Sequence, residues 1–228
     1  MNLEFDARDT TLQEEAHRFA EETIAPFAAT IDQTGELPAE LLGRLRKSDV
    51  LKPFLPKELG GEDLQLFSLT LLLEEVAKYS PVIGILMAQQ VVLGIRATMK
   101  FLNSPDRAEL AKRAARFEGI FSIAATEPGA GCDLSMIETK CRKNADGTFA
   151  LTGGKAYVNW VNRCEGLFVL ARVDEPETTG TTMMLVRNPS DGLIIGKKHG
   201  TMGLGGIEAA PIELNISNLP ADSLAGVH

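Results

Sequence analysis

The feature that most constrains this chain is a change in hydrophobic periodicity near residue 119. Before that point, apolar residues recur at spacings of three and four, which is the period of an amphipathic helix. After it, short apolar runs alternate with turn residues and no helical pattern returns. The sequence therefore predicts an α+β fold, with an all-α helical domain over residues 1–118 and a small antiparallel β-barrel domain over residues 119–228.

The first half contains local signals for where its helices begin and end. Thr11 and Glu14 fit a capping box, so a helix is expected to begin there. Pro26 should bend or end that helix, because proline lacks the backbone N–H that a helix interior needs. The most apolar stretch predicts a buried helix over about 82–102. Ser104 and Pro105 are typical of an N-cap and a first helical residue, and indicate a last, charged helix.

The second half is divided by turn signals into about eight short strands. The segment Asn144–Gly147 (NADG) is a hairpin signal, and Gly153-Gly154 is interpreted as a second turn. The expected strands cover 120–125, 136–142, 148–152, 155–161, 166–173, 181–187, 192–197 and 211–216.

Composition excludes several classes of function. The formal charge is −8, from 23 Lys and Arg against 31 Asp and Glu, and no Lys/Arg-rich run is present, so neither nucleic acid nor an anionic membrane is an expected partner. The apolar run 82–95 is too short and too polar to be read as a membrane span, and no signal peptide is expected in residues 1–20. Three cysteines without CxxC spacing suit free thiols in the reducing cytoplasm. No metal site is expected, because the three histidines are far apart in sequence: His17, His199 and His228.

The most unusual local sequence is the segment Ala125–Asp133 (ATEPGAGCD), directly after the first expected strand. Pro128 restricts φ, whereas Gly129 and Gly131 permit positive φ, so that several backbone N–H groups can point outward together. Such a loop suits a pyrophosphate or the polar edge of a heteroaromatic ring. A rigid turn between strands explains the same residues equally well.

A second candidate segment is Lys155–Trp160 (KAYVNW), which holds the only tryptophan of the chain. Strand alternation places Tyr157 and Asn159 on one face and Val158 and Trp160 on the other. One face could flank a flat cofactor, although the pattern alone favours burial in an ordinary core. A third segment, Gly200–Gly206, predicts only a flexible loop.

Read together, these segments resemble the acyl-CoA dehydrogenase family. The segment Thr126–Asp133 is similar to the flavin-contacting signature of that family, and the remaining motifs follow in the same order over nearly the whole chain. They are the Pro-x-x-x-Gly-Gly turn in Leu55–Gly61, the helix segment Leu73–Ala77, the Lys-x-Trp-Ile-Thr strand in Lys155–Asn159, and the closing segments Lys198–Gly203, Ile216–Pro220 and Leu224–Gly226.

The resemblance implies an FAD enzyme in which a carboxylate removes the α-proton of an acyl-CoA thioester while the β-hydride passes to the flavin, giving a trans-2-enoyl-CoA. In the family, FAD lies between the barrel and a C-terminal helical bundle. Thr126 would hydrogen-bond the ring edge, and Cys132 would contact pyrophosphate or acyl-CoA. The full set of implied flavin-contacting residues is Ile123, Ala125, Thr126, Gly131, Cys132, Tyr157, Val158 and Asn159.

Two positions depart from the family pattern. Asn159 stands where Thr or Ser is usual, and Cys132 stands where Ser or Thr is common. An amide still donates a hydrogen bond with a different reach, whereas a thiol is a weak donor. No catalytic residue is assigned, because most members take the catalytic carboxylate from the bundle, which would begin near His228. Glu127 is interpreted as part of the structural signature.

Three readings of function stay open at this stage. The leading one is a flavin-dependent acyl-CoA dehydrogenase represented by its first two domains, as part of a longer chain or with a partner that supplies the rest. The second is a non-catalytic subunit that binds acyl-CoA or a partner on the same scaffold, and the third is a relative that uses flavin for oxygen chemistry. Expected partners are acyl-CoA, an electron-transferring flavoprotein or other electron acceptor, and further subunits in a homo- or hetero-oligomer. Leu86, Met87 and Gln90 are candidates for the acyl pocket, with core packing favoured for each.

Overall fold

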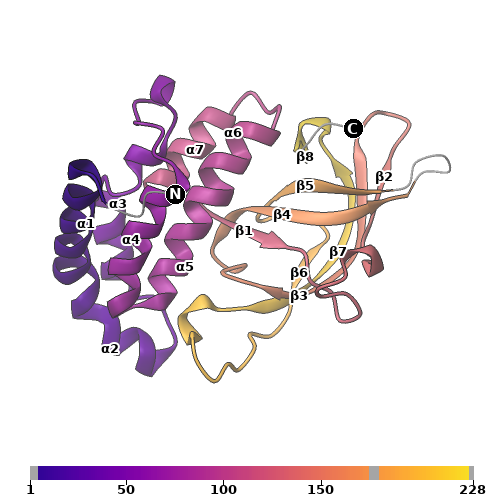
Figure 1. Cartoon of the computed structure of the whole chain (residues 1–228). Helices are drawn as coiled ribbons and strands as arrows, with labels where there is room; N and C mark the ends of the chain where they lie inside the picture. The colour runs from indigo at the N-terminus through magenta and orange to yellow at the C-terminus, as the bar shows by residue number, and fades with distance from the viewer. Residues whose placement is uncertain (1–4, 175–179, 226–228) are drawn as a thin grey trace.

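The computed structural model describes residues 5–174 and 180–225, and within them all the α-helices precede all the strands (Figure 1). The predicted landmarks at Gly226 and His228 lie outside the described residues. The α-helices are α1 (Ala7–Phe19), α2 (Ala25–Thr34), α3 (Ala39–Lys47), α4 (Leu66–Tyr79), α5 (Pro81–Gln89), α6 (Thr98–Phe101) and α7 (Arg107–Ala115). The α+β class is therefore confirmed.

Two of the predicted helix signals are wrong in detail, and of the two outcomes predicted for Pro26 an end of the helix is not observed. The capping box lies at Asp6 and Asp9, and Thr11 sits inside α1, where its hydroxyl donates to the Ala7 carbonyl at 2.9 Å. Pro26 does not end the helix, because a π-helical segment leads directly into the first turn of α2, where a missing N–H is tolerated. Helix α7 begins after Asp106, so Ser104 and Pro105 precede it.

The strands form one eight-stranded sheet in the order β6-β7-β3-β2-β4-β5-β8, with β1 paired to β4. The strands are β1 (Ile120–Ala124), β2 (Lys140–Lys143), β3 (Phe149–Val158), β4 (Cys164–Val173), β5 (Thr181–Arg187), β6 (Leu193–Ile195), β7 (Ala210–Leu219) and β8 (Leu224–Ala225).

The prediction of a closed, antiparallel barrel is wrong in two respects. The sheet is open, because the strand order ends with β6, which pairs with β7, and with β8, which pairs with β5. These terminal strands have only three and two residues. It is also mixed, because both β1 and β2 run parallel to β4. These two strands share one edge of β4: β1 pairs along its first half and β2 only with its last two residues. The edge of β4 on which one antiparallel strand would pair in a regular sheet is therefore divided between β1 and β2.

Strand β3 replaces the two strands predicted around Gly153-Gly154. Gly153 has a φ of 146°, and a Cβ built on it would lie 2.6 Å from the Cα of Thr139. The glycine therefore lets the segment before β2 cross close over an uninterrupted strand and does not make a turn. The other turn prediction is confirmed: Gly147 N–H donates to the Asn144 carbonyl at 3.0 Å, between the antiparallel strands β2 and β3.

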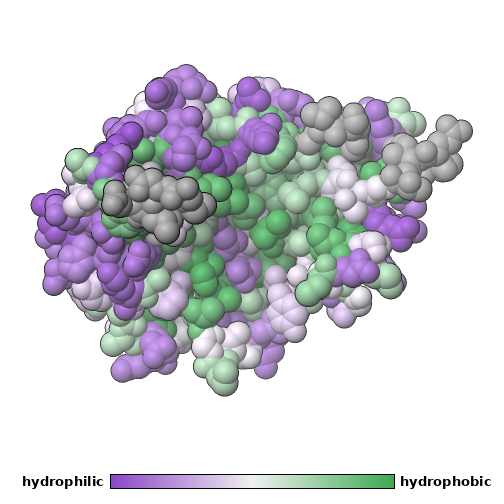
Figure 2. Space-filling model, in the orientation of Figure 1, coloured by the Kyte–Doolittle hydropathy of each residue, from purple (hydrophilic) through white to green (hydrophobic). Residues whose placement is uncertain are grey.

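The helical part and the sheet are joined through the long apolar helix Pro81–Phe101, which combines α5, a π-helical segment (Gln90–Ala97) and α6. This helix is long and apolar enough to cross a membrane by length and composition alone, but 61% of its most apolar window is buried inside the chain. On the face shown in Figure 2, hydrophobic surface gathers between the helices and the sheet. The helix is a core helix of this fold.

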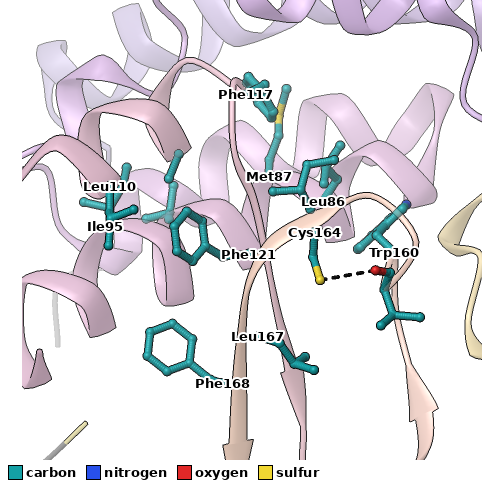
Figure 3. Close-up of a cluster of buried hydrophobic side chains, with 14 of the residues drawn as sticks. Leu86, Met87, Ile95, Leu110, Phe117, Phe121, Trp160, Cys164, Leu167 and Phe168 are labelled. Carbon is teal, nitrogen blue, oxygen red and sulfur yellow. Dashed lines mark hydrogen bonds between the residues drawn. The ribbon is translucent and has the colours of Figure 1, made fainter. Parts of the chain in front are cut away.

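The buried Gln90 connects this helix to the start of the sheet. Its Nε2 donates to the carbonyls of Ala114 and Gly119 at 2.9 and 2.7 Å, and its Oε1 accepts the N–H of Phe121 at 2.9 Å. Apolar side chains of the helix and of strands β1 and β4 belong to one hydrophobic cluster (Figure 3). Phe121 contacts Phe168 with ring centroids 6.5 Å apart. Core packing is thus the observed role of Leu86, Met87 and Gln90.

Candidate flavin-binding site

The site begins with a tight turn directly after β1. Glu127 and Ala130 exchange two backbone hydrogen bonds, with N···O distances of 2.8 and 3.1 Å. Gly129 and Gly131 are not among the glycines with positive φ in the described chain, so the turn does not use the positive φ that these residues permit. A Cβ on either glycine would meet no atom within 4 Å, so both leave open space above the turn.

An ion pair fixes this turn to strand β3. The Glu127 carboxylate lies 2.8 Å from Nζ of Lys155, and the two side chains are 6% and 0% exposed. The carboxylate also accepts the N–H groups of Glu138 and Thr139 at 2.6 and 3.0 Å, and Lys155 donates further to the Ala125 carbonyl at 3.0 Å. The ion pair therefore joins three segments: the turn, β3 and the chain that leads into β2.

The electrostatics of this pair determine what Glu127 does. Burial alone would raise the pKa of Glu127, but the hydrogen bonds from Lys155, Thr139 and Glu138 outweigh burial and lower the pKa from 4.5 to about 2. Burial lowers the pKa of Lys155, and the attraction of Glu127 only partly opposes that shift. Glu127 is thus held as a carboxylate whose partners are already in place, which suits an anchor and not a general base.

Thr126 has two hydrogen-bond donors, its hydroxyl and its amide N–H, that take no part in the network around Glu127 and Lys155. Its carbonyl accepts the N–H of Ala156 at 2.8 Å, which fixes the backbone of Thr126 against β3. Within residues 5–174 and 180–225, neither the hydroxyl nor the amide N–H of this half-buried residue donates a hydrogen bond. A half-buried pair of free donors is costly unless a ligand or water accepts from it.

The residues at the end of β3 and directly after it alternate between buried and more exposed positions, as predicted. Tyr157 is 62% exposed and Asn159 is half-buried, whereas Val158 and Trp160 are fully buried. Trp160 donates its Nε1–H to the Gly206 carbonyl at 2.9 Å, so it belongs to the core. The buried side chain of Val158 leaves only its backbone for contact with a cofactor.

The remaining predicted site residues lie on the neighbouring strand and loop. Ile123 of β1 is 36% exposed, and Ala125 is half-buried at the end of that strand. Gly131 and Cys132 are exposed, and Cys132 is a free thiol. In the next turn, the Asp133 side chain accepts the Ser135 N–H at 3.0 Å.

The sequence analysis did not predict the position of His199, which lies next to Tyr157. Its ring contacts the ring of Tyr157 with centroids 4.7 Å apart, and its Nε2 lies 2.7 Å from the Ala156 carbonyl. Its backbone N–H donates to the Ala209 carbonyl at 2.8 Å. The segment Lys198–Gly203 resembles a motif of the acyl-CoA dehydrogenase family, but nothing in its sequence indicated a contact with β3, more than 40 positions earlier in the chain.

The chemistry of this set fits a flavin. The free O–H and N–H of Thr126 match the carbonyl and nitrogen acceptors at the polar edge of an isoalloxazine, and Ile123 and Tyr157 supply apolar and aromatic surface beside it. Ile123 lies on β1 and Tyr157 on β3, and these two strands lie close together in the fold (Figure 1). In the described part of the chain, no group of His, Cys, Asp and Glu side chains is arranged to hold a metal ion.

Comparison with protein families gives two matches in chain order. The N-terminal domain of acyl-CoA dehydrogenases matches residues 6–118, and the middle domain of acyl-CoA dehydrogenases matches residues 122–216. Among curated relatives, the 3-(aryl)acrylate reductase of Clostridium sporogenes is 27% identical over 211 residues, which cover 92% of this chain and 56% of that protein. The 3-sulfinopropanoyl-CoA desulfinase of Paraburkholderia xenovorans is 30% identical over 205 residues, covering 90% and 52%.

Solved structures show the same fold. Butyryl-CoA dehydrogenase from Megasphaera elsdenii superposes with a TM-score of 0.89 at 24% identity, covering 100% of this chain and 61% of that one. A glutaryl-CoA dehydrogenase from Mycobacterium smegmatis, solved in complex with FADH2, has a TM-score of 0.85 at 20% identity, covering 98% and 57%. This chain spans little more than half the length of the curated relatives that it matches. On the family matches and their order, the chain belongs to the acyl-CoA dehydrogenase family.

Proposed function

We propose that this chain provides the flavin-facing and acyl-CoA-facing surface of an FAD-dependent acyl-CoA dehydrogenase, which converts an acyl-CoA thioester to the trans-2-enoyl-CoA. One observation carries the proposal: the half-buried Thr126, three positions after the exposed Ile123 and tied through its carbonyl to the residue before the exposed Tyr157, keeps two donors without an acceptor among the described residues. A planar heteroaromatic ring with acceptors on one edge satisfies all three residues at once.

In this proposal each residue has a definite task. Thr126 donates from its hydroxyl and amide to the polar edge of the ring, while Ile123 and Tyr157 cover the plane and exclude water. Asn159 donates at a neighbouring position, Val158 and Ala125 contribute backbone groups, and Gly131 and Cys132 border the pyrophosphate or the acyl-CoA. FAD, when bound, supplies the acceptor for the β-hydride of the thioester. The base that takes the α-proton is not assigned, since the Glu127 carboxylate is held by Lys155.

The same proposal includes the substrate, the partners and the compartment. The substrate is an acyl-CoA, the electrons leave to an electron-transferring flavoprotein or other acceptor, and the chain works as part of a homo- or hetero-oligomer in the cytoplasm. A second candidate is a non-catalytic subunit that binds acyl-CoA or a partner on this scaffold. Cys132 and Asn159 favour that candidate, because they replace the hydroxyl side chains that are common in the family.

Flavin titration followed by anaerobic addition of acyl-CoA tests the proposal. The chain is titrated with FAD, and binding is followed by the change in flavin fluorescence. The variant Thr126→Val should weaken binding, whereas Thr152→Val should leave it unchanged, because Thr152 is exposed on β3, outside the turn that carries Thr126, and its side chain makes no hydrogen bond in the described structure. Equal affinity of both variants contradicts the assignment of Thr126.

The second step separates the two candidate functions. Bleaching of the flavin absorbance by acyl-CoA, with formation of enoyl-CoA, supports the dehydrogenase. Binding of acyl-CoA without bleaching, in the chain and in its complete assembly, supports the non-catalytic subunit.

A further inference from the structure

His199 is the residue next to the candidate site with the most defined geometry and no role in the proposed function. It lies in the segment between β6 and β7, 42 positions after Tyr157. Three contacts fix it: the backbone bond to Ala209 holds its main chain, the bond from Nε2 to Ala156 holds one edge of the imidazole, and the Tyr157 ring lies 4.7 Å from its face.

These contacts determine which imidazole nitrogen carries a proton. The Ala156 carbonyl only accepts hydrogen bonds, so Nε2 must donate and therefore carries the proton in the neutral ring. Nδ1 has no partner among the described residues, and in the neutral ring it is a bare acceptor. The hydrogen bond thus aims one edge of the ring at β3 and leaves one face of the ring against Tyr157.

The exposed ring of Tyr157 has few other restraints. It is 62% exposed, and its hydroxyl makes no hydrogen bond to the described residues. An exposed aromatic side chain rotates about χ1 and χ2 unless a neighbour restricts it, and that freedom is lost when a ligand packs on the ring. A ring held in advance by a second ring therefore binds a flat ligand at a smaller entropic cost.

We propose that His199 is a positioning residue that holds the ring of Tyr157 for contact with the flavin and acts on the flavin only through Tyr157. This inference rests on the proposed function, because it takes the flavin as the ligand of Tyr157. The contact between the rings of His199 and Tyr157, on which the inference is built, does not depend on any ligand. The experiment therefore has one arm without flavin and one with it.

The first arm uses nuclear magnetic resonance of the histidine rings in the flavin-free chain. Tyr157→Leu should move the ring-proton signals of His199, because the ring current of Tyr157 is lost, and should leave His17 unmoved. The 15N signals should show a protonated Nε2 and a bare Nδ1 at neutral pH. Unmoved His199 signals, or the opposite tautomer, overturn the pair whatever happens to flavin binding.

The second arm measures FAD affinity and the residual fluorescence of the bound flavin. His199→Ala should weaken FAD binding by about 3- to 10-fold, the range that corresponds to one aromatic pair. The double variant with Tyr157→Leu should be no weaker than Tyr157→Leu alone, since His199 acts through that ring. Additive losses overturn the inference, and His17→Ala is the control with unchanged affinity.

Two further variants separate the ring contact from the hydrogen bond. His199→Phe keeps a ring beside Tyr157 but no donor, and should retain most of the quenching of flavin fluorescence. His199→Gln keeps a donor toward Ala156 but no ring, and should lose the quenching of flavin fluorescence. The reverse result assigns His199 to loop structure alone and refutes the inference. If the unchanged chain fails to bind FAD while the first arm succeeds, the proposed function fails and the ring pair stands.

Discussion

Removal of Lys155 provides the sharpest test of how the turn Glu127–Ala130 of the candidate site is held. In Lys155→Met, the apolar side chain keeps most of the length of the lysine, but the Glu127 carboxylate, which is 6% exposed, loses its only cationic partner among the described residues. Leaving one member of a buried ion pair without its partner costs about 3–5 kcal/mol of folding free energy. The two backbone N–H donors of Glu138 and Thr139 remain, so the lower part of that range is expected.

Arg8→Met is the matched control for this substitution. The Arg8–Glu62 pair has nearly the same separation, 2.7 Å against 2.8 Å, but its side chains are 64% and 59% exposed. An exposed pair contributes about 0–1 kcal/mol, because water screens the attraction. The free energy of unfolding is measured for both variants by urea denaturation at pH 7. Equal losses in the two variants would refute the argument that burial decides the strength of the pair.

The dependence of stability on pH gives an independent measurement of the same pair. The pKa of Glu127 is lowered on folding from 4.5 to about 2, so its contribution to stability is complete above about pH 4.5 and is lost as the pH falls toward 2. A shift of this size corresponds to about 3 kcal/mol, and the lowered pKa of Lys155 offsets part of it at neutral pH. Glu127→Gln should therefore flatten the stability profile between these pH values. A variant profile parallel to that of the unchanged chain contradicts the assigned pKa.

Three further substitutions follow from the structure. In the flavin-loaded assembly, Thr126→Val should lower the midpoint potential of the flavin by tens of millivolts. A hydrogen bond to a charged group is worth about 1.5–3 kcal/mol, and about 30 mV corresponds to 1.4 kcal/mol for two electrons. An unchanged potential with normal flavin content makes Thr126 a turn residue only. Gly153→Ala should destabilise the chain by more than about 2 kcal/mol in urea denaturation, because its Cβ would overlap backbone, whereas Gly129→Ala, with open space, should cost less than about 1 kcal/mol. Gln90→Leu removes the partner of the Phe121 N–H and of the Gly119 carbonyl, while the Ala114 carbonyl keeps the N–H of Phe117, and should cost about 1–3 kcal/mol by the same measurement; a neutral result contradicts its role at the joint between helices and sheet.

Local patterns in the sequence predicted those parts of the fold that depend on neighbouring residues. The change of period near residue 119 gave the α+β class, and alternation placed Tyr157 and Val158 on opposite faces of β3. The NADG hairpin was also predicted, because its turn is closed by residues within four positions. The capping box was misplaced, since Asp6–Asp9 and Thr11–Glu14 both fit its pattern and only the observed start of α1 distinguishes them.

Features that depend on contacts distant in sequence were not predicted. The sheet was expected to close, but closure depends on which strand takes each edge of β4, and β1 and β2 divide one of them. Gly153-Gly154 has the composition of a turn, and only the close crossing of Thr139 shows why the strand needs glycine there. His199 was missed for the same reason, because its contacts with β3 are long-range.

Strand β3 joins the stability of this chain to its candidate site within three consecutive residues. Lys155 points into the core and holds Glu127, and Ala156 uses its N–H for the Thr126 carbonyl and its own carbonyl for His199. Tyr157 then faces outward, because successive side chains of a strand point to opposite faces. A change at Lys155 is therefore expected to reach the candidate flavin-binding surface without altering any side chain on it, by loosening the turn next to Thr126. Effects on flavin binding at this strand are accordingly separable from effects on folding only when variants are compared at an equal folded fraction.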